Sequence, residues 1–329
     1  MNTLGGIGLG DLRWGMPYSL LRSDAPVHRL SGSRCLTADL DKRGRSYLNY
    51  LITTFLKLAG IADDAEMKKN LVGEIRLLTV NYLLGPALGI FICLLEAFGR
   101  IKFLHFERFP IWEEKLIIVS NHPSLLEPVI LPLIGFPWMN FPWIFSPLWS
   151  RVKFSLSWLR ELKKEFSLYK KLIPANVPDR QNFYDPPFWR LFQGINVPVN
   201  RNEGAHGRVG TVLTLKKILE SGGRVLIFPE GTRTFKAIRK GRVTSAGGKE
   251  LGKLKGGAGW LALTTGARVL PIWVEGTDKV LPNNKFPFPR LWHKVTIKIG
   301  HPFLVRGSTR EEATSEITQA LLNLADEKA

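Results

Sequence analysis

Short runs of apolar residues alternate with helix-like segments through much of this 329-residue chain, and this alternation constrains the fold more than any other feature. Three runs have the length and composition of buried strands: LIIVS (116–120), RVLIFP (224–229) and RVLPIWV (268–274). Strands that alternate with helices are typical of α/β proteins. The sequence therefore predicts an α/β fold with a mixed, largely parallel sheet flanked by helices.

Other elements are expected around these strands. Further strands are predicted at 197–200 and 295–299, and helices at 206–223, 256–267 and 308–327. The last helix has Ser308 and Glu311 at the spacing of a capping box. Amphipathic helix patterns occupy about 148–172, and a polar, proline-containing loop is expected at 174–187. We find no internal repeat.

The amino-terminal part of the chain differs in composition from the rest. Residues 1–46 are rich in Gly, Ser and Arg and are expected to be poorly ordered, without the pattern of a secretory signal. A helical, membrane-associating region is expected at 47–100, followed by an α/β domain at 101–329. Within the helical region, 77–95 carries no charge, and nineteen helical residues would span about 28 Å, close to the thickness of a bilayer core. The stretch is interpreted as a helix that spans or dips into lipid. Because Asn, Gly and Pro interrupt it, a buried helix of a soluble fold is the alternative.

A second uncharged stretch at 128–150 has prolines at every fifth position from 132 to 147 and three tryptophans. Proline breaks helix interiors, so a regular spanning helix is excluded. Tryptophan favours the boundary between lipid and water. The stretch is interpreted as an apolar wall that meets lipid or lines an acyl channel, with a buried proline-rich crossover as the alternative.

The net charge of +18 favours anionic partners. The basic residues are scattered and accompanied by long apolar stretches, which favours a membrane surface. A nucleic-acid binder would interleave basic residues with exposed stacking aromatics, whereas these aromatics stand among prolines and aliphatic residues. Two cysteines cannot form a disulfide framework, and neither Cys nor His shows the spacing of a metal site.

The first candidate for chemistry is NHPSLLEP (121–128), directly after the run LIIVS. Histidine is the side chain best suited to remove a proton near neutral pH, and a carboxylate can fix its tautomer and stabilise the imidazolium. If a helix begins at Pro123 and Ser124, the carboxylate of Glu127 lies one turn in and can reach back to His122. Taken alone, the pair is more often an ordinary loop histidine beside an ordinary acid, because chance spacings of this kind are common.

Three further segments stand at predicted strand ends, where α/β folds place ligands. VPVNR (197–201) ends in Arg201, and VLPIWVEGT (269–277) offers a strand end that can support a pocket. FPEGTRT (228–234) is more specific. Its glycine lets backbone N–H groups approach a ligand, its threonine offers a hydroxyl, and its arginine can grip phosphate with two hydrogen bonds.

Taken in order, NHPSLLEP, VPVNR, FPEGTRT and VLPIWVEG resemble the glycerolipid acyltransferase family, in which 1-acylglycerol-3-phosphate acyltransferases are common members. The resemblance covers about 115–305. It implies transfer of a fatty acyl group from a thioester to the free hydroxyl of a lysophosphatidic acid. His122 would be the general base and Glu127 would orient it. The acceptor's phosphate would be held by Arg201, Glu230, Gly231, Thr232 and Arg233.

The resemblance also implies partners and a location. The acyl donor would be acyl-CoA or an acidic acyl carrier protein, with no bound cofactor, no metal and no nucleic acid. The protein would associate with a membrane on its cytoplasmic or organelle stromal face. The alternatives are a glycerol-3-phosphate or other lysolipid acyltransferase, or an inactive membrane-binding homologue.

Two features depart from the family pattern. Glu127 stands where the family has Asp, which lengthens the reach of the carboxylate by one methylene. The segment 234–257 is strongly basic and is longer than the usual link of the family that it resembles. It is interpreted either as a solvated, mobile loop or as a surface for anionic lipid heads, coenzyme A phosphates or an acidic carrier protein.

Overall fold

The computed structural model describes residues 85–134, 171–186, 196–200, 202, 204–282 and 289–328. The chain divides into two compact units, Met1–Ala62 and Asp63–Ala329, and every described residue belongs to the second. The expectations for 1–46, for most of 128–150 and for 148–170 lie outside the described residues. The domain boundaries proposed from the sequence stay predictions.

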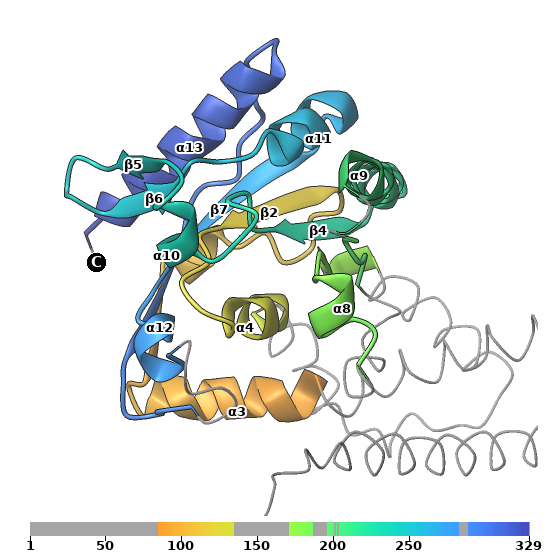
Figure 1. Ribbon diagram of the computed structural model, residues 1–329. Helices are drawn as coiled ribbons and strands as arrows, with labels where there is room; N and C mark the ends of the chain where they lie inside the picture. The colour runs from red at the N-terminus through yellow and green to blue at the C-terminus, as the bar shows by residue number, and fades with distance from the viewer. Residues whose placement is uncertain are drawn as a thin grey trace, which may run out of the picture. The chain divides into compact units, whose positions relative to one another are not determined.

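The centre of the described part is a six-stranded sheet with the order β1–β8–β7–β2–β4–β3 (Figure 1). Its strands are β1 (Ile101–Leu104), β2 (Leu116–Ser120), β3 (Ala175–Asn176), β4 (Arg224–Ile227), β7 (Arg268–Glu275) and β8 (Val295–Ile299). All neighbouring pairs are parallel except β7 and β8, which are antiparallel. The predicted mixed, largely parallel sheet is confirmed.

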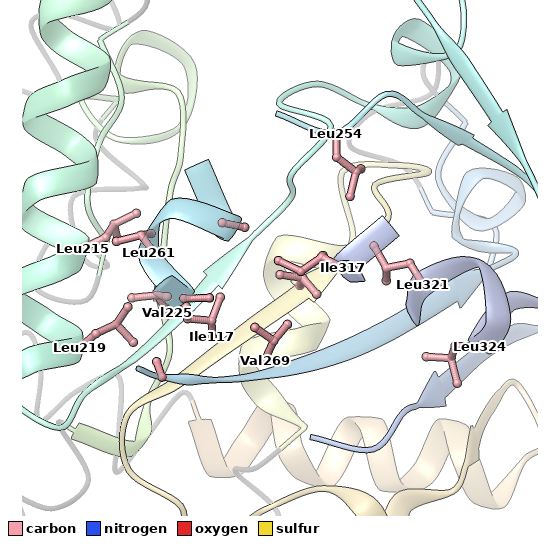
Figure 2. Close-up of a cluster of buried hydrophobic side chains, with 14 of the residues drawn as sticks. Ile117, Leu215, Leu219, Val225, Leu254, Leu261, Val269, Ile317, Leu321 and Leu324 are labelled. Carbon is pink, nitrogen blue, oxygen red and sulfur yellow. The ribbon is translucent and has the colours of Figure 1, made fainter. Parts of the chain in front are cut away.

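Helices cover both faces of this sheet (Figure 1). One face carries α9 (Gly204–Glu220), α11 (Gly257–Thr265) and α13 (Arg310–Asp326), and the other carries α3 (Gly85–Ala97) and α4 (Glu127–Leu133). Side chains alternate along β2 because successive residues of a strand point to opposite faces. Ile117 and Val119 join the cluster under α9, α11 and α13, shown in Figure 2, whereas Leu116 and Ile118 join the cluster that includes residues of α3 and α4.

The remaining elements are short. They are η2 (Phe106–Arg108), α8 (Arg180–Phe183), α10 (Thr234–Ala237), α12 (Thr277–Val280) and the antiparallel pair β5 (Arg242–Thr244) and β6 (Glu250–Gly252). The basic segment 234–257, for which a solvated loop was one of two interpretations, contains α10 and a hydrogen-bonded hairpin. Lys240, Lys253 and Arg239 are exposed on it.

Several element predictions need correction. The predicted strand 197–200 forms only an isolated parallel bridge, between Val199 and Asp179. The predicted loop 174–187 contains β3 and α8. The capping box lies one residue later than predicted: the Thr309 side chain accepts from the Glu312 N–H at 3.2 Å, and the Glu312 side chain accepts from the Thr309 N–H at 3.2 Å. Glu311 instead pairs with its neighbour Arg310.

The uncharged stretch 77–95 is described only from Gly85, where α3 begins. Within the described ranges, no helix is both long enough and apolar enough to cross a membrane. Ile92 on α3 is buried in the same cluster as Leu116 and Ile118. The side chains of Ile90, Phe91, Leu94 and Phe98 are exposed. The described turns of this stretch thus form a helix with one face packed on the protein.

Candidate active site

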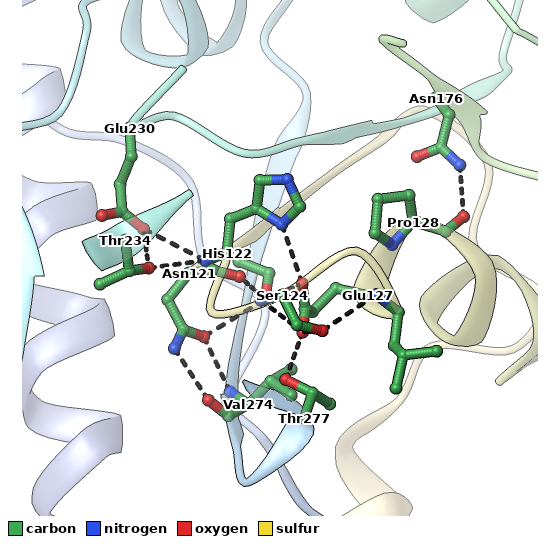
Figure 3. A network of polar contacts seen from close by, with 12 residues as sticks. Asn121, His122, Ser124, Glu127, Pro128, Asn176, Glu230, Thr234, Val274 and Thr277 are labelled. Carbon is green, nitrogen blue, oxygen red and sulfur yellow. Dashed lines mark hydrogen bonds and ion pairs between the residues drawn. The ribbon is translucent and has the colours of Figure 1, made fainter. Parts of the chain in front are cut away.

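Three loops meet where the parallel strands β2, β4 and β7 end. These strands are neighbours in the sheet and run in the same direction, so their carboxyl ends lie at one edge. His122 follows β2, Glu230 follows β4 and Thr277 follows β7. Open α/β sheets place their ligands at this edge. Residues separated by more than a hundred positions in sequence are brought together here, as Figure 3 shows.

His122 and Glu127 form a direct pair. The imidazole Nδ1 lies 2.8 Å from Oε2 of Glu127, whose side chain is fully buried. A carboxylate can only accept, so the proton of this hydrogen bond is on Nδ1, and Nε2 is left as the basic nitrogen. The imidazole stacks on Phe228 with ring centroids 4.3 Å apart, and its side chain is 13% exposed. The ring is therefore fixed on one face and remains accessible.

The carboxylate of Glu127 is held by more than the histidine. Oε1 accepts from the Ser124 hydroxyl at 3.0 Å, and Oε2 accepts from the Ser124 N–H at 3.0 Å. The hydroxyl of Thr277 also donates to Oε1. A buried carboxylate needs such donors because burial removes its hydration. The charge needed to orient His122 is thus stabilised by groups from two loops.

The route by which Glu127 reaches His122 differs from the prediction. The helix does not begin at Pro123 and Ser124, since α4 begins at Glu127 itself. Residues 123–126 form a bend in which the Leu126 N–H donates to the Ser124 hydroxyl at 3.0 Å. The bend, and not a helical turn, folds the chain back so that the carboxylate faces the ring. Glutamate supplies the required reach from the first residue of the helix.

Glu230 joins the turn after β4 to the histidine loop. Its carboxylate accepts from the main-chain N–H of His122 at 3.1 Å, from the Thr234 hydroxyl at 2.6 Å and from the Gly252 N–H at 2.9 Å. Burial raises the pKa of Glu230, and these three donors act in the opposite direction. An anion with internal donors on both oxygens is poorly suited to hold a phosphate. We therefore interpret Glu230 as a residue that positions His122.

Gly231, Thr232 and Arg233 complete the turn and are all partly exposed. Gly231 has φ +68°, and a Cβ on it would lie 2.3 Å from Nζ of Lys255. Arg233 lies over the Phe235 ring, 5.1 Å from its centroid. Desolvation lowers the pKa of Arg233, while the charge of Glu127 raises it. Lys255 therefore lies against the glycine of this turn, and Arg233 follows that glycine two residues later. Arg201 lies outside the described residues.

Sequence reasoning missed three residues that hold this arrangement: Asn121, Ser124 and Thr277. The Asn121 side chain donates to the Val274 carbonyl and accepts from the Val274 N–H, both at 2.8 Å. All three lie inside the quoted motifs, but their partners come from other loops or from a bend that was not predicted. Within the described ranges, no group of His, Cys, Asp and Glu has the arrangement of a metal site.

Comparison with known proteins agrees with the class that the motifs indicate. Residues 176–275 match the family model described as Acyltransferase. The match includes the turn at 230–233 and all of β7, and it begins after His122 and Glu127. The match confirms the acyltransferase class that was predicted from the sequence. Among solved structures, the 1-acyl-sn-glycerophosphate (LPA) acyltransferase PlsC from Thermotoga maritima is similar, with 17% identity, 86% of this chain and 90% of that chain covered, and a TM-score of 0.46.

Proposed function

We propose that this enzyme transfers a fatty acyl group from an acyl thioester to the free hydroxyl of a lysophosphatidic acid, with His122 as the general base and Glu127 orienting it. The observation that carries the proposal is the 2.8 Å contact between His122 Nδ1 and the buried carboxylate of Glu127, beside the turn that contains Arg233. The acyltransferase match supports the reaction class. The acceptor class rests on the four motifs.

The proposed reaction is a single displacement. Nε2 of His122 removes the proton of the acceptor hydroxyl as its oxygen attacks the thioester carbonyl. The new C–O bond forms, the C–S bond breaks, and the departing thiolate takes the proton from the imidazolium. Glu127 stabilises the imidazolium between these two transfers. Ser124 has no place as a nucleophile, because its buried hydroxyl donates to Glu127.

The phosphate of the acceptor would be held by cationic and N–H groups beside the base. Arg233 is partly exposed in the same turn whose Glu230 contacts His122, so one substrate can reach both. Guanidinium groups bind phosphate with two parallel hydrogen bonds, which fixes the orientation of the acceptor as well as its charge. Gly231 and Thr232 lie in the same turn. Arg201 keeps the role that the family resemblance gives it.

The donor and the location follow from charge and from the acceptor. The exposed basic residues at 239–253 suit either coenzyme A phosphates or an acidic acyl carrier protein. A lysophosphatidic acid is delivered from lipid, so the enzyme would work at the cytoplasmic or stromal face of a membrane. Glycerol 3-phosphate and other lysolipids are the alternative acceptors.

The test supplies labelled acyl-CoA or acyl carrier protein and a panel of acceptors to the wild type, to His122→Ala and to His301→Ala. The wild type and the exposed-histidine control should acylate lysophosphatidic acid. His122→Ala should lose at least about 100-fold in kcat, the low end for a general base. Equal rates in wild type and His122→Ala would overturn the role of the base. A wild type that acylates no acceptor would favour an inactive membrane-binding homologue.

The phosphate site is tested by Arg233→Ala and Arg233→Lys. Arg233→Ala should raise KM for lysophosphatidic acid by about tenfold or more, while turnover of a monoacylglycerol without phosphate should change little. Arg233→Lys should recover part of the affinity, because the charge is kept but the two-pronged geometry is lost. An equal effect on both acceptors would contradict a phosphate contact.

A further inference from the structure

We propose that Thr277 is a positioning residue of the acyl-transfer site. Its hydroxyl holds the carboxylate of Glu127 in the position from which that carboxylate bonds His122. The inference rests on the proposed function of the His122–Glu127 pair and adds a residue from a different part of the chain. Thr277 is 150 positions away from Glu127, and both side chains are fully buried. Its hydroxyl donates to Oε1 of Glu127.

The two oxygens of Glu127 have different partners. Oε2 faces His122 Nδ1 at 2.8 Å, and Oε1 accepts from the hydroxyls of Ser124 and Thr277. Ser124 lies on the same short bend as the pair, so it moves with the bend. Thr277 follows β7 at the edge of the sheet. The position of its hydroxyl therefore does not depend on the conformation of the bend. Rotation of the carboxylate away from the ring would break the hydrogen bond to Thr277.

The backbone before Thr277 is shaped to deliver this hydroxyl. Gly276 has φ +85°, and a Cβ on it would lie 2.2 Å from the main-chain oxygen of Lys294. Any other residue type at Gly276 would require the backbone directly before β8 to shift. The turn ends β7 abruptly and begins α12 at Thr277, whose side chain points inward toward α4 (Figure 3). The conformation of Gly276 therefore fixes the position of the Thr277 hydroxyl after the end of β7.

A second contact from the same strand end supports the arrangement. Asn121 is bonded through both its amide oxygen and its amide nitrogen to the backbone of Val274, at 2.8 Å each. The end of β7 thus holds the histidine loop at residue 121 and at residue 127. His122 lies between these two anchors. Loss of the Thr277 hydroxyl would release one anchor and leave the other, so the loop should stay folded while the pair loses its alignment.

The test compares variants that differ by one hydroxyl group. Thr277→Val keeps the volume and removes the donor, and Thr277→Ser keeps the donor. Thr265→Val is the matched control, because Thr265, the last residue of α11, is also buried and donates at 2.6 Å to the Leu261 carbonyl. Each variant is assayed for kcat and KM of donor and acceptor, and for its melting temperature.

Thr277→Val should lose about tenfold or more in kcat with both KM values within about twofold of wild type, since misalignment of a catalytic group acts on turnover. Thr277→Ser should stay within about threefold of wild type. Thr265→Val should lower the melting temperature without lowering kcat. Wild-type kcat in Thr277→Val, or a loss of kcat in Thr277→Ser as large as in Thr277→Val, would overturn the proposal.

Two further comparisons keep the result decisive. If Thr277→Val does not fold, Thr277→Ala and Thr277→Ser differ from each other only in the hydroxyl group, and equal kcat values in this pair would overturn the proposal. His122→Ala is assayed beside them. Unchanged activity in His122→Ala would refute the proposed base, whereas an inactive His122→Ala with a fully active Thr277→Val would refute only the role of Thr277.

Discussion

The main-chain N–H of His122 donates to the carboxylate of Glu230 at 3.1 Å, across 108 positions of sequence. A second bond returns in the other direction, since the Thr234 N–H donates to the His122 carbonyl at 2.8 Å. The backbone of the proposed base is therefore attached to the turn that carries Arg233. The loop proposed to carry the base and the turn proposed to hold the phosphate are thus bonded to each other.

Replacing Glu230 with glutamine should impair turnover. The amide keeps the shape of the side chain, but its single oxygen cannot accept from His122, Thr234 and Gly252 together. We expect kcat to fall about tenfold or more, because a displaced base loses its alignment with the acceptor. Glu250→Gln, at an exposed residue paired with Arg242, is the control. Unchanged kinetics in Glu230→Gln would show that the alignment of His122 does not depend on this carboxylate.

Glu127→Asp tests the departure from the family pattern. The carboxylate would withdraw by about 1.5 Å, the length of one carbon–carbon bond. Since Glu127 is the first residue of α4, the helix would have to shift to restore the 2.8 Å contact. We expect partial activity in Glu127→Asp and a larger loss in Glu127→Gln, measured as kcat. Full activity in Glu127→Gln would contradict an orienting carboxylate, and an inactive Glu127→Asp would show that this pocket requires the longer side chain.

Alanine at Gly231 and alanine at Gly248 should destabilise the protein by similar amounts, but only Gly231→Ala should lower activity. Both glycines have positive φ, +68° and +82°, so both substitutions carry backbone strain of about 1–2 kcal/mol. At Gly231 the added Cβ meets the flexible amino end of Lys255, which can move aside, whereas Gly248 has open space within 4 Å. Urea denaturation measures the two losses of stability. We expect a loss of activity in Gly231→Ala alone, because the added Cβ displaces Lys255 from the turn beside His122, and equal activity in the two variants would contradict a special role for this turn.

An ion pair that links η2 to the end of α13 should make stability sensitive to acid. Arg108 bonds both carboxylate oxygens of Glu327, at 2.7 and 3.0 Å, and this hydrogen bonding lowers the pKa of Glu327. A lowered pKa in the folded state stabilises the protein above the ordinary Glu pKa of about 4.3, and that contribution is lost as the pH falls through the lowered pKa. Arg108→Met should therefore flatten the decline in urea midpoint below about pH 4.3. An unchanged acid profile, with exposed Arg306→Met as control, would contradict this assignment.

The outer face of α3 should contribute to membrane binding. Ile90, Phe91 and Leu94 on this face, and Phe98 directly after the helix, are 45 to 74% exposed at helical spacing. Apolar residues on one face of a helix can enter the boundary of a bilayer. The double variant Phe91→Ser and Leu94→Ser should lower co-sedimentation with anionic vesicles by at least about fivefold, if a few buried side chains each contribute about 1 kcal/mol or more. Val209→Ser and Leu213→Ser, exposed on α9, form the matched control, and an equal loss in both pairs would refute a specific face.

The strands and helices that sequence reasoning predicted well are those with strong local signals. The runs at 116–120, 224–227 and 268–275 are buried on both faces, so their apolar composition alone distinguishes them. The short strands at 101–104 and 175–176 were not predicted. Each is defined by pairing with one neighbour at an edge of the sheet, and that pairing leaves no periodic pattern in so few residues.

The amino-acid sequence by itself determined the α/β class, the acyltransferase motifs and the choice of His122 and Glu127 as a pair, because apolar periodicity and residue chemistry are local properties. Only the tertiary structure decided how the pair is held. Glu230 and Thr277 contact the pair from more than a hundred positions away, and Asn121, which precedes His122, is bonded to the equally distant Val274. These contacts form at the common edge of β2, β4 and β7. Hydrogen bonds between loops depend on the register of parallel strands, and no spacing along the chain encodes that register.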